Sequence, residues 1–152
     1  MNIRPYQGSD ESQLLVVWNS SMAADNLDEV LFRTKVLLDS NFQAANLPVA
    51  VEDDRVVGFA LVVTRQVPLF LQGLEPEQAW ITAFGVLPAY QRRGIGTALF
   101  RYADKRIKAQ GRKSLSISPY VPNYFIPGVD IKAYPGTIEF LTKAGFKIVD
   151  LY

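Results

Sequence analysis

The residues best suited to chemistry in this sequence lie in one short segment, residues 91–97. The segment holds the pair Arg92 and Arg93 and the glycines Gly94 and Gly96. It follows an apolar, strand-like run and leads directly into a helical pattern. Arginine side chains, unpaired N–H groups of a glycine-containing turn and the positive end of a helix dipole all attract negative charge. The segment therefore predicts a binding site for an anion such as phosphate.

Two common phosphate-binding motifs do not fit this segment. A dinucleotide fingerprint needs a third Gly or Ala three residues after the second glycine, where this chain has Leu99. A Walker P-loop needs Gly-Lys followed by Ser or Thr, and that motif is absent. A lone Gly-x-Gly indicates only a turn with solvated arginines. The anion site is favoured because the apolar strand, a Val-x-Pro break, the Gln-Arg-Arg and the helix start follow one another without interruption.

At these residues the chain resembles the GNAT superfamily of acyl-CoA-dependent N-acetyltransferases. The family signature Gln/Arg-x-x-Gly-x-Gly/Ala matches residues 91–96, and the preceding strand end Val-x-Pro matches residues 86–88. Residues 140–146 match the family's closing segment, an apolar helix that ends in Gly-Phe. The resemblance covers nearly the whole chain.

The resemblance implies acetyl-CoA, or a related acyl-CoA, as co-substrate, with no metal. Amides of the turn would hold the pyrophosphate, and the backbone of residues 84–86 would pair with the pantetheine arm like an added strand. A glycine at position 85 would permit that close approach. The implied cofactor-binding residues are Phe84, Gly85, Val86, Gln91, Arg92, Arg93, Gly94, Ile95, Gly96 and Thr97.

The residues that usually catalyse the reaction in this family are not present at the matching positions of this sequence. Trp80 occupies the position of the strand glutamate that acts as base, and Leu141 occupies that of the tyrosine acid. Histidine and cysteine are both absent, so the common neutral-pH base and a thiolate are excluded. Three interpretations stay open: acid–base groups from the aromatic loop of residues 119–136, proximity alone acting on a free amine, or acyl-CoA binding without catalysis.

Within the aromatic loop we predict Tyr134 as the first catalytic residue and Tyr124 as the second. Tyr134 begins the helix beside the expected cofactor arm. Tyr120 is a further hydroxyl of the loop, and Asp130 and Glu139 are the nearby carboxylates. As a cluster, these aromatic side chains are expected to line an acceptor pocket.

The elements that must position these residues follow from the hydrophobic periodicity. Strand patterns cover residues 2–7, 47–52, 56–64, 79–87, 113–118 and the start of a last strand from 147; helical patterns begin near residues 9, 26, 95 and 135. The second helix is expected to bury Leu27, Val30, Leu31, Thr34 and Leu38. The order β-α-α-β-β-β-α-β-α-β predicts an α/β fold around a twisted, mixed, GNAT-like sheet.

The family fold ends in two strands after its last helix, and this sequence stops at residue 152, inside the first of them. The second of these two strands is expected to be missing. We therefore expect either a longer parent protein with a second domain or a homodimer in which a partner covers the open sheet edge.

Composition places the chain among ordinary globular proteins. Its 152 residues fit a single domain over residues 1–152, and the net charge of +1 argues against a nucleic-acid partner. No apolar run is long enough to span a membrane, and the N-terminus lacks a signal-peptide core, which favours a cytoplasmic location.

The sequence thus predicts an N-acetyltransferase acting on a primary amine of a small molecule or a protein. The first alternative is a non-catalytic acyl-CoA-binding domain with a structural or regulatory role. A phosphate- or nucleotide-binding module unrelated to CoA is a further alternative.

Overall fold

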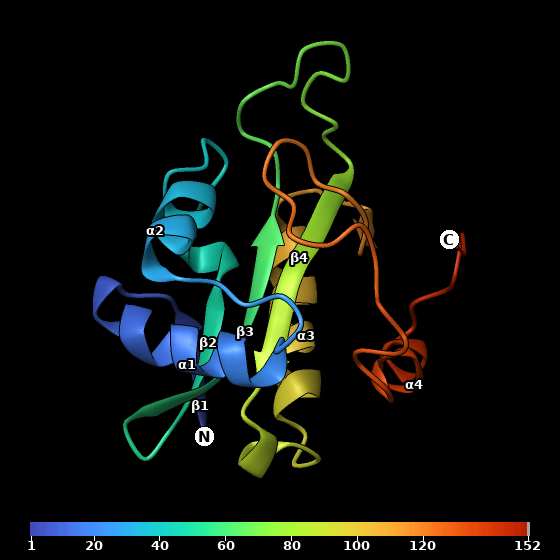
Figure 1. The fold of residues 1–152 in the computed structure, drawn as a ribbon. Coiled ribbons are helices and arrows are strands. Elements are labelled where there is room, and N and C mark those ends of the chain that lie inside the picture. Colours follow the sequence, from blue (N-terminus) through green and yellow to red (C-terminus); the bar gives the residue numbers. More distant parts are fainter. Residues whose placement is uncertain (152) are drawn as a thin grey trace.

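A five-stranded mixed sheet forms the centre of the computed structural model, which describes residues 1–151 (Figure 1). The strands lie side by side in chain order, the first four antiparallel to one another and the fifth parallel to the fourth. They are β1 (Asn2–Pro5), β2 (Pro48–Glu52), β3 (Arg55–Val63), β4 (Gln78–Val86) and β5 (Ser114–Ser116).

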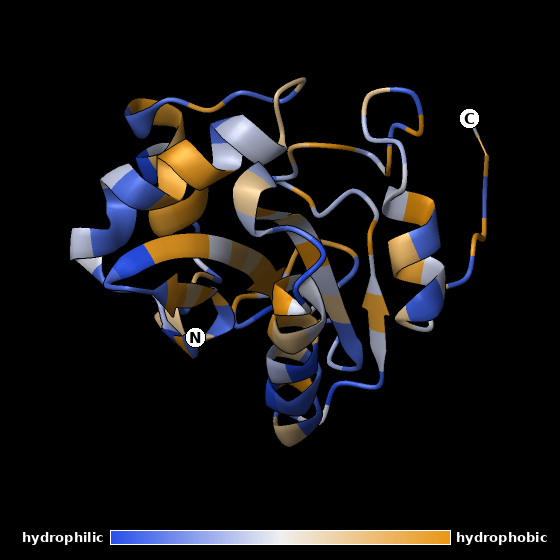
Figure 2. Cartoon of the chain, turned by 90° about the horizontal axis from the view of Figure 1, so that it is seen from below, coloured by the Kyte–Doolittle hydropathy of each residue, from blue (hydrophilic) through white to orange (hydrophobic). Residues whose placement is uncertain are grey.

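Helices cover both faces of the sheet. The helices are α1 (Glu11–Ser21), α2 (Glu29–Phe32), α3 (Ile95–Ala109) and α4 (Thr137–Lys143). In Figures 1 and 2, α1 and α2 lie on one face, α3 lies on the other, and α4 stands at the β5 side of the molecule. Figure 2 shows apolar colour along the strands and alternation of apolar and polar colour around α3. This layering confirms the predicted mixed α/β fold class.

The core is densest around β3, whose residues from Val56 onward are all buried. On one face Trp18 of α1 stacks on Phe59, with ring centroids 5.3 Å apart. On the other face α3 packs so closely that a Cβ added at Gly58 would lie 3.1 Å from the Leu99 side chain. A strand buried on both faces explains why this segment is a continuous apolar run.

The second helix buries a different face from the predicted one. Leu27 is buried as expected, but Val30 and Leu38 are 64% and 77% exposed, and the residues facing the core are Phe32 and Val36. Within α2 itself Phe32 is the buried residue. After α2 the chain continues as a π turn over Arg33–Leu37, in which the Leu38 amide bonds the Arg33 carbonyl five residues back. This wider turn changes which of the following residues face the core.

The strand predicted to start at residue 147 does not form in the residues that the structure describes, so this prediction is wrong. The last helix begins at Thr137, after Gly136 in the left-handed conformation (φ 88°), and ends with Gly145 at φ 101°. The Phe146 amide then bonds the Leu141 carbonyl, the 6→1 bond of a Schellman stop. Residues 147–151 pair with no strand, and Val149 is 95% exposed. Residue 152 lies outside the described residues.

Candidate active site

The central cavity lies where β4 and β5 stop pairing. The two strands are in register only from Gln78 opposite Ser114 to Trp80 opposite Ser116. Beyond Trp80, a cavity of about 530 Å³ is lined by residues 81–86 of β4 on one side and Ile117 on the other. This volume is in the range of small-molecule sites in proteins. The strands therefore separate between β4 and β5, while β3 stays paired with β4 as far as Val86.

A β-bulge accompanies this separation. Leu61 lies opposite Ala83 and Val62 opposite Ile81, so Thr82 is an extra residue with no partner on β3. A bulge bends the strand and increases its local twist. We attribute the divergence of β4 from β5 to this bend.

The predicted anion-binding turn forms one end of the cavity. Among residues 1–151, no acceptor is paired with the backbone amides of residues 92–97; the first helical bond runs from the Ala98 amide to the Gly94 carbonyl (3.0 Å). Gly94 and Arg92 both have positive φ, 82° and 61°. The predicted cofactor-binding residues that line the cavity are Phe84, Gly85, Val86, Gln91, Arg92, Gly94, Ile95, Gly96 and Thr97.

Two side chains of the turn have local roles. Gln91 donates its amide N–H to the Val86 carbonyl (3.0 Å), which ties the turn to the end of β4. The Arg93 guanidinium lies 5.1 Å from the Tyr90 ring centroid, and Arg93 is not among the cavity-lining residues. Arg92 is therefore the arginine of the pair that faces the cavity.

Two glycines of the site allow neighbouring elements to pack closely. A Cβ at Gly85 would lie 1.9 Å from the Ser21 hydroxyl of α1. Because glycine has no Cβ, α1 can lie directly against β4 at this position. A Cβ at Gly96 would lie 3.1 Å from the ring of Phe140, which brings α4 onto the first turn of α3. From the sequence we expected Gly85 to let the coenzyme approach the backbone. In the structure, Ser21 of α1 occupies the space that a side chain at position 85 would fill.

Tyr134 lines the opposite part of the cavity and is joined to Asp25. Its hydroxyl donates a hydrogen bond to the Asp25 carboxylate, and its amide donates to the Asp130 carbonyl (2.9 Å). Burial and, next, the hydrogen bond to Asp25 raise the pKa of Tyr134 well above its ordinary value. The Tyr134 hydroxyl therefore keeps its proton throughout the neutral range.

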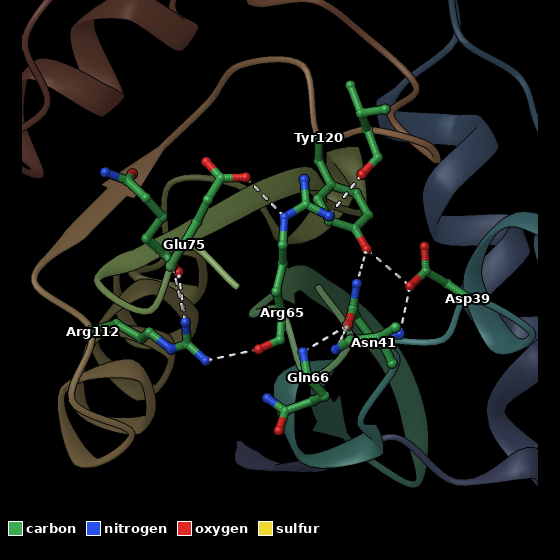
Figure 3. A network of polar contacts seen from close by, with 10 residues as sticks. Asp39, Asn41, Arg65, Gln66, Glu75, Arg112 and Tyr120 are labelled. Carbon is green, nitrogen blue, oxygen red and sulfur yellow. Dashed lines mark hydrogen bonds and ion pairs between the residues drawn. The ribbon is translucent and has the colours of Figure 1, made fainter. Parts of the chain in front are cut away.

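The other tyrosines of the aromatic loop lie elsewhere. Tyr124 is 40% exposed and is not among the cavity-lining residues. Tyr120 is buried, accepts a hydrogen bond from the Asn41 amide group (2.6 Å) and donates one to Asp39 (3.0 Å), as Figure 3 shows. Burial raises the pKa of Tyr120 to about 12. The structure thus brings Tyr134 to the cavity and places Tyr120 in the core.

A buried arginine holds the loops above the sheet in place. The Arg65 side chain donates to Glu75 (2.9 Å) and to the Val121 carbonyl (2.9 Å) (Figure 3). Its guanidinium also lies 4.9 Å from the ring centroids of both Trp80 and Tyr120. These cation–π and hydrogen-bond contacts join the loops after β3 and β5 to β4. Trp80, at the position of the family's glutamate, belongs to this packing.

Two charged side chains of the cavity lining form an ion pair. Lys143 donates to Glu139 at 2.9 Å, and this contact, with a smaller contribution from Arg92, holds the pKa of Glu139 below its usual range. Within residues 1–151 no group of three or more Asp or Glu side chains is arranged to hold a metal ion, and no helix is long and apolar enough to span a bilayer.

Sequence reasoning missed Asp25 and Thr82 as parts of this site. Asp25 lies 109 residues before Tyr134, and no motif links the two positions. Thr82 lies within an apolar strand, and only the bulge distinguishes it from its neighbours. Neither residue carries a signal in the sequence from which its role could be found.

Comparison with known families identifies the chain. The model of the acetyltransferase (GNAT) family matches residues 12–124, which span β3, β4 and the turn. The chain therefore belongs to the GNAT family of acetyltransferases and is an acyl-CoA N-acyltransferase of that type. No curated protein matches the sequence.

Solved structures share the fold at low sequence identity. A transcriptional regulator from Bacillus halodurans C-125 is 21% identical with a TM-score of 0.71, covering 99% of this chain and 95% of its own. The ribosomal-protein-S18-alanine N-acetyltransferase from Escherichia coli is 16% identical with a TM-score of 0.68, covering 98% and 79%. An aminoglycoside N-acetyltransferase in complex with CoA is 14% identical with a TM-score of 0.64, covering 99% and 95%.

Proposed function

We propose that this protein transfers an acetyl group from acetyl-CoA to a primary amine of a small molecule or a protein, with the amine held beside Tyr134. One observation carries the proposal: a single cavity is lined both by the turn of unpaired amides and by Tyr134. The turn is suited to a phosphate-bearing co-substrate. Tyr134 is the tyrosine of the aromatic loop that lines the same cavity.

The coenzyme would be held by backbone groups. The amides of residues 92–97 and the Arg92 guanidinium would take the pyrophosphate. Residues 84–86 use one edge of β4 to pair with Gly58, Phe59 and Ala60 of β3, and the other edge faces the cavity. That free edge supports pairing of an extended amide-bearing arm as an added strand.

The acyl transfer needs a nucleophilic amine and a stabilised leaving group. The amine nitrogen forms a bond to the acyl carbon, and the carbon–sulfur bond breaks with its electron pair on sulfur. Because an ordinary thiol has a pKa of about 8.5, full proton transfer from the less acidic Tyr134 is unfavourable. We assign Tyr134 as a hydrogen-bond donor to the developing thiolate: its single hydroxyl proton turns from the Asp25 carboxylate to the sulfur as negative charge develops there. The thiolate then takes its proton from water.

The direct test is thiol release from acetyl-CoA by the purified protein, with a panel of primary amines and coenzyme binding measured by calorimetry. We expect amine-dependent thiol release. Coenzyme binding without thiol release for any amine would contradict the proposal and favour a non-catalytic acyl-CoA-binding domain.

The anion end can be tested separately with Arg92→Gln. Removing one charge-assisted contact to phosphate is expected to weaken coenzyme binding by about tenfold, and less at high salt because the contact is exposed. Arg55→Gln is the matched control, since Arg55 is an exposed arginine outside the cavity lining. Equal losses in both variants would show that the turn does not bind the coenzyme.

A further inference from the structure

The lining of the central cavity is charged only near the turn. Within residues 1–151, its charged side chains are Arg92 of the turn and Glu139 and Lys143 of α4. Helix α4 lies against the turn, since a Cβ at Gly96 would lie only 3.1 Å from the Phe140 ring. Lys143 donates to Glu139 (2.9 Å), and Arg92 is the arginine that we assign to the coenzyme. The rest of the lining therefore offers a substrate no charged side chain.

Aliphatic side chains form the cavity walls on the side of the aromatic loop. Ile126, Val129 and Ala133 belong to this loop, which connects β5 to α4 (Figure 1), and Ile117 directly follows β5. Ile126 and Tyr134 pack against the same cluster of buried residues. Ile117, Ile126 and Val129 line the cavity and are only half-buried. Accessible apolar walls in a cavity favour a ligand that has apolar surface of its own.

The polar side chains on this side of the cavity are bonded within the protein or buried. The Ser21 hydroxyl donates to the Val17 carbonyl (2.6 Å), and the Tyr134 hydroxyl donates to the Asp25 carboxylate. The Thr82 hydroxyl is buried, and Asp25 is not among the cavity-lining residues. An ammonium group placed against these walls would lose its water without gaining a carboxylate, and burying an unpaired charge is strongly unfavourable.

We propose that the acceptor is an apolar primary monoamine whose hydrocarbon part lies against Ile117, Ile126 and Val129, with its amine group beside Tyr134. This inference rests on the proposed acyl transfer and names its acceptor class. Amines that carry a second ammonium group are disfavoured, because these walls have no carboxylate to pair with it. Ile126 and Val129 then determine specificity, since they contact the part of the acceptor that does not react.

The same walls favour the reactive form of the amine. Only the neutral amine has an electron pair for the acyl carbon, and an alkylamine, with a pKa of about 10.4 in water, is mostly protonated at pH 7. An apolar environment disfavours the charged form and lowers the pKa of an amine. The walls thus help to supply the nucleophile in a chain with no histidine and with Trp80 at the glutamate position. The proton that the nitrogen loses as the amide forms passes to solvent.

The first test compares two acceptors of matched size in the thiol-release assay with acetyl-CoA. One is hexylamine, and the other is the diamine in which an ammonium group replaces the terminal methyl of hexylamine. We expect kcat/KM to be at least about tenfold higher for hexylamine, because its methyl end is buried at no charge penalty. In a series from ethylamine to hexylamine, kcat/KM should rise about fourfold for each methylene group that reaches the walls.

The second test places a carboxylate on the wall with Val129→Asp. The preference for hexylamine over the diamine should fall by about tenfold or more, because the new charge pairs with the second ammonium group. Ile131→Asp is the matched control, since Ile131 lies in the same loop, is 61% exposed and is not among the cavity-lining residues. Thermal unfolding and coenzyme affinity check that both variants are folded. Val129→Thr, which nearly keeps the side-chain shape, should lower kcat/KM for hexylamine about threefold.

The pH profile of kcat gives a readout that a merely structural role would not move, because it reports groups in the bound complex. With hexylamine, its midpoint should lie below the pKa of the free amine, and Val129→Asp should raise that midpoint.

The acceptor assignment alone would be overturned by equal use of the two matched amines, or by an unchanged preference in Val129→Asp and Val129→Thr. A dependence on the length of the acyl group of the acyl-CoA, with none on the amine, would assign the walls to the acyl chain and overturn it as well. Absence of thiol release with every amine would overturn the proposed function and this inference together.

Discussion

Tyr134 and Asp25 form a hydrogen-bonded pair although no sequence signal links the two positions. Burial and, next, the hydrogen bond to Asp25 raise the pKa of the phenol, so Tyr134 keeps its proton. A raised pKa makes a phenol a weaker acid but leaves it a competent hydrogen-bond donor. The role that we propose for Tyr134 is therefore to stabilise a leaving thiolate and not to protonate it.

We predict that Tyr134→Phe lowers kcat by about 10²-fold, the effect of removing one donor to a developing anion, with coenzyme affinity unchanged. The matched control is Tyr124→Phe, which removes the hydroxyl of an exposed tyrosine outside the cavity lining. Steady-state kinetics with acetyl-CoA and an active amine measure both. Equal kcat for Tyr134→Phe and the unaltered protein would contradict the role of this hydroxyl, and a loss only in Tyr124→Phe would transfer the role to Tyr124.

At the scale of elements, the site depends on how closely helices approach the strands that carry it. Helix α1 packs against β4 at Gly85, and α4 packs against α3 at Gly96. At each contact the neighbouring side chain lies where the Cβ of a larger residue would be. Both glycines look like cofactor residues in the sequence. In the structure they also set the position of the helices that wall the cavity.

We predict that Gly85→Ala destabilises the fold by about 1–3 kcal/mol, the usual cost of overpacking. The new Cβ would lie 1.9 Å from the Ser21 Oγ and 2.8 Å from its Cβ, and Ser21 is held by its bond to the Val17 carbonyl (2.6 Å). Urea denaturation measures the loss. Gly128→Ala is the control because nothing lies within 4 Å of its added Cβ.

A second-site change makes this test specific. Ser21→Gly removes both clashing atoms, so the double variant with Gly85→Ala should be less destabilised than the sum of the two single changes. Simple additivity would show that the contact between α1 and β4 is not the cause.

At the scale of the whole molecule, ion pairs link elements that are distant from the site. Arg4 of β1 donates two hydrogen bonds to Asp10 (2.8 and 2.9 Å), and Asp10 is 5% exposed. The hydrogen bond from Arg4 lowers the pKa of Asp10. A carboxylate whose folded pKa is lowered contributes stability above its unfolded pKa of about 3.9, and this contribution is lost as pH falls through the folded pKa.

We predict that Asp10→Asn lowers the free energy of unfolding by about 1–3 kcal/mol at pH 7. The gap to the unaltered protein should close as pH falls below about 4, because Asp10 is then protonated in both states. Asp104→Asn, which breaks the exposed pair with Lys108, should change stability by less than about 0.5 kcal/mol. A gap that stays constant down to about pH 2.5 would contradict the linkage to Asp10.

Most of the fold could be predicted from the sequence because the patterns that indicate its helices, strands and turns are local. The hairpin of β2 and β3, the amphipathic α3 and the Schellman stop at Gly145 all follow from periodicity and glycine position. The buried face of α2 and the unpaired tail of residues 147–151 were predicted wrongly. A π turn and a missing neighbour are properties of tertiary context, which a periodic pattern does not encode.

By itself, the sequence determined the fold class, the family signature and the turn of residues 91–97, because each depends on a few residues adjacent in the chain. Only the tertiary structure decided which residues of the aromatic loop line the cavity. It brought Tyr134 to Asp25, buried Tyr120 against Trp80, and placed Thr82 at a bulge beside the cavity. Such pairings join residues tens of positions apart, and they depend on strand register and on the packing of loops, which local propensities do not specify.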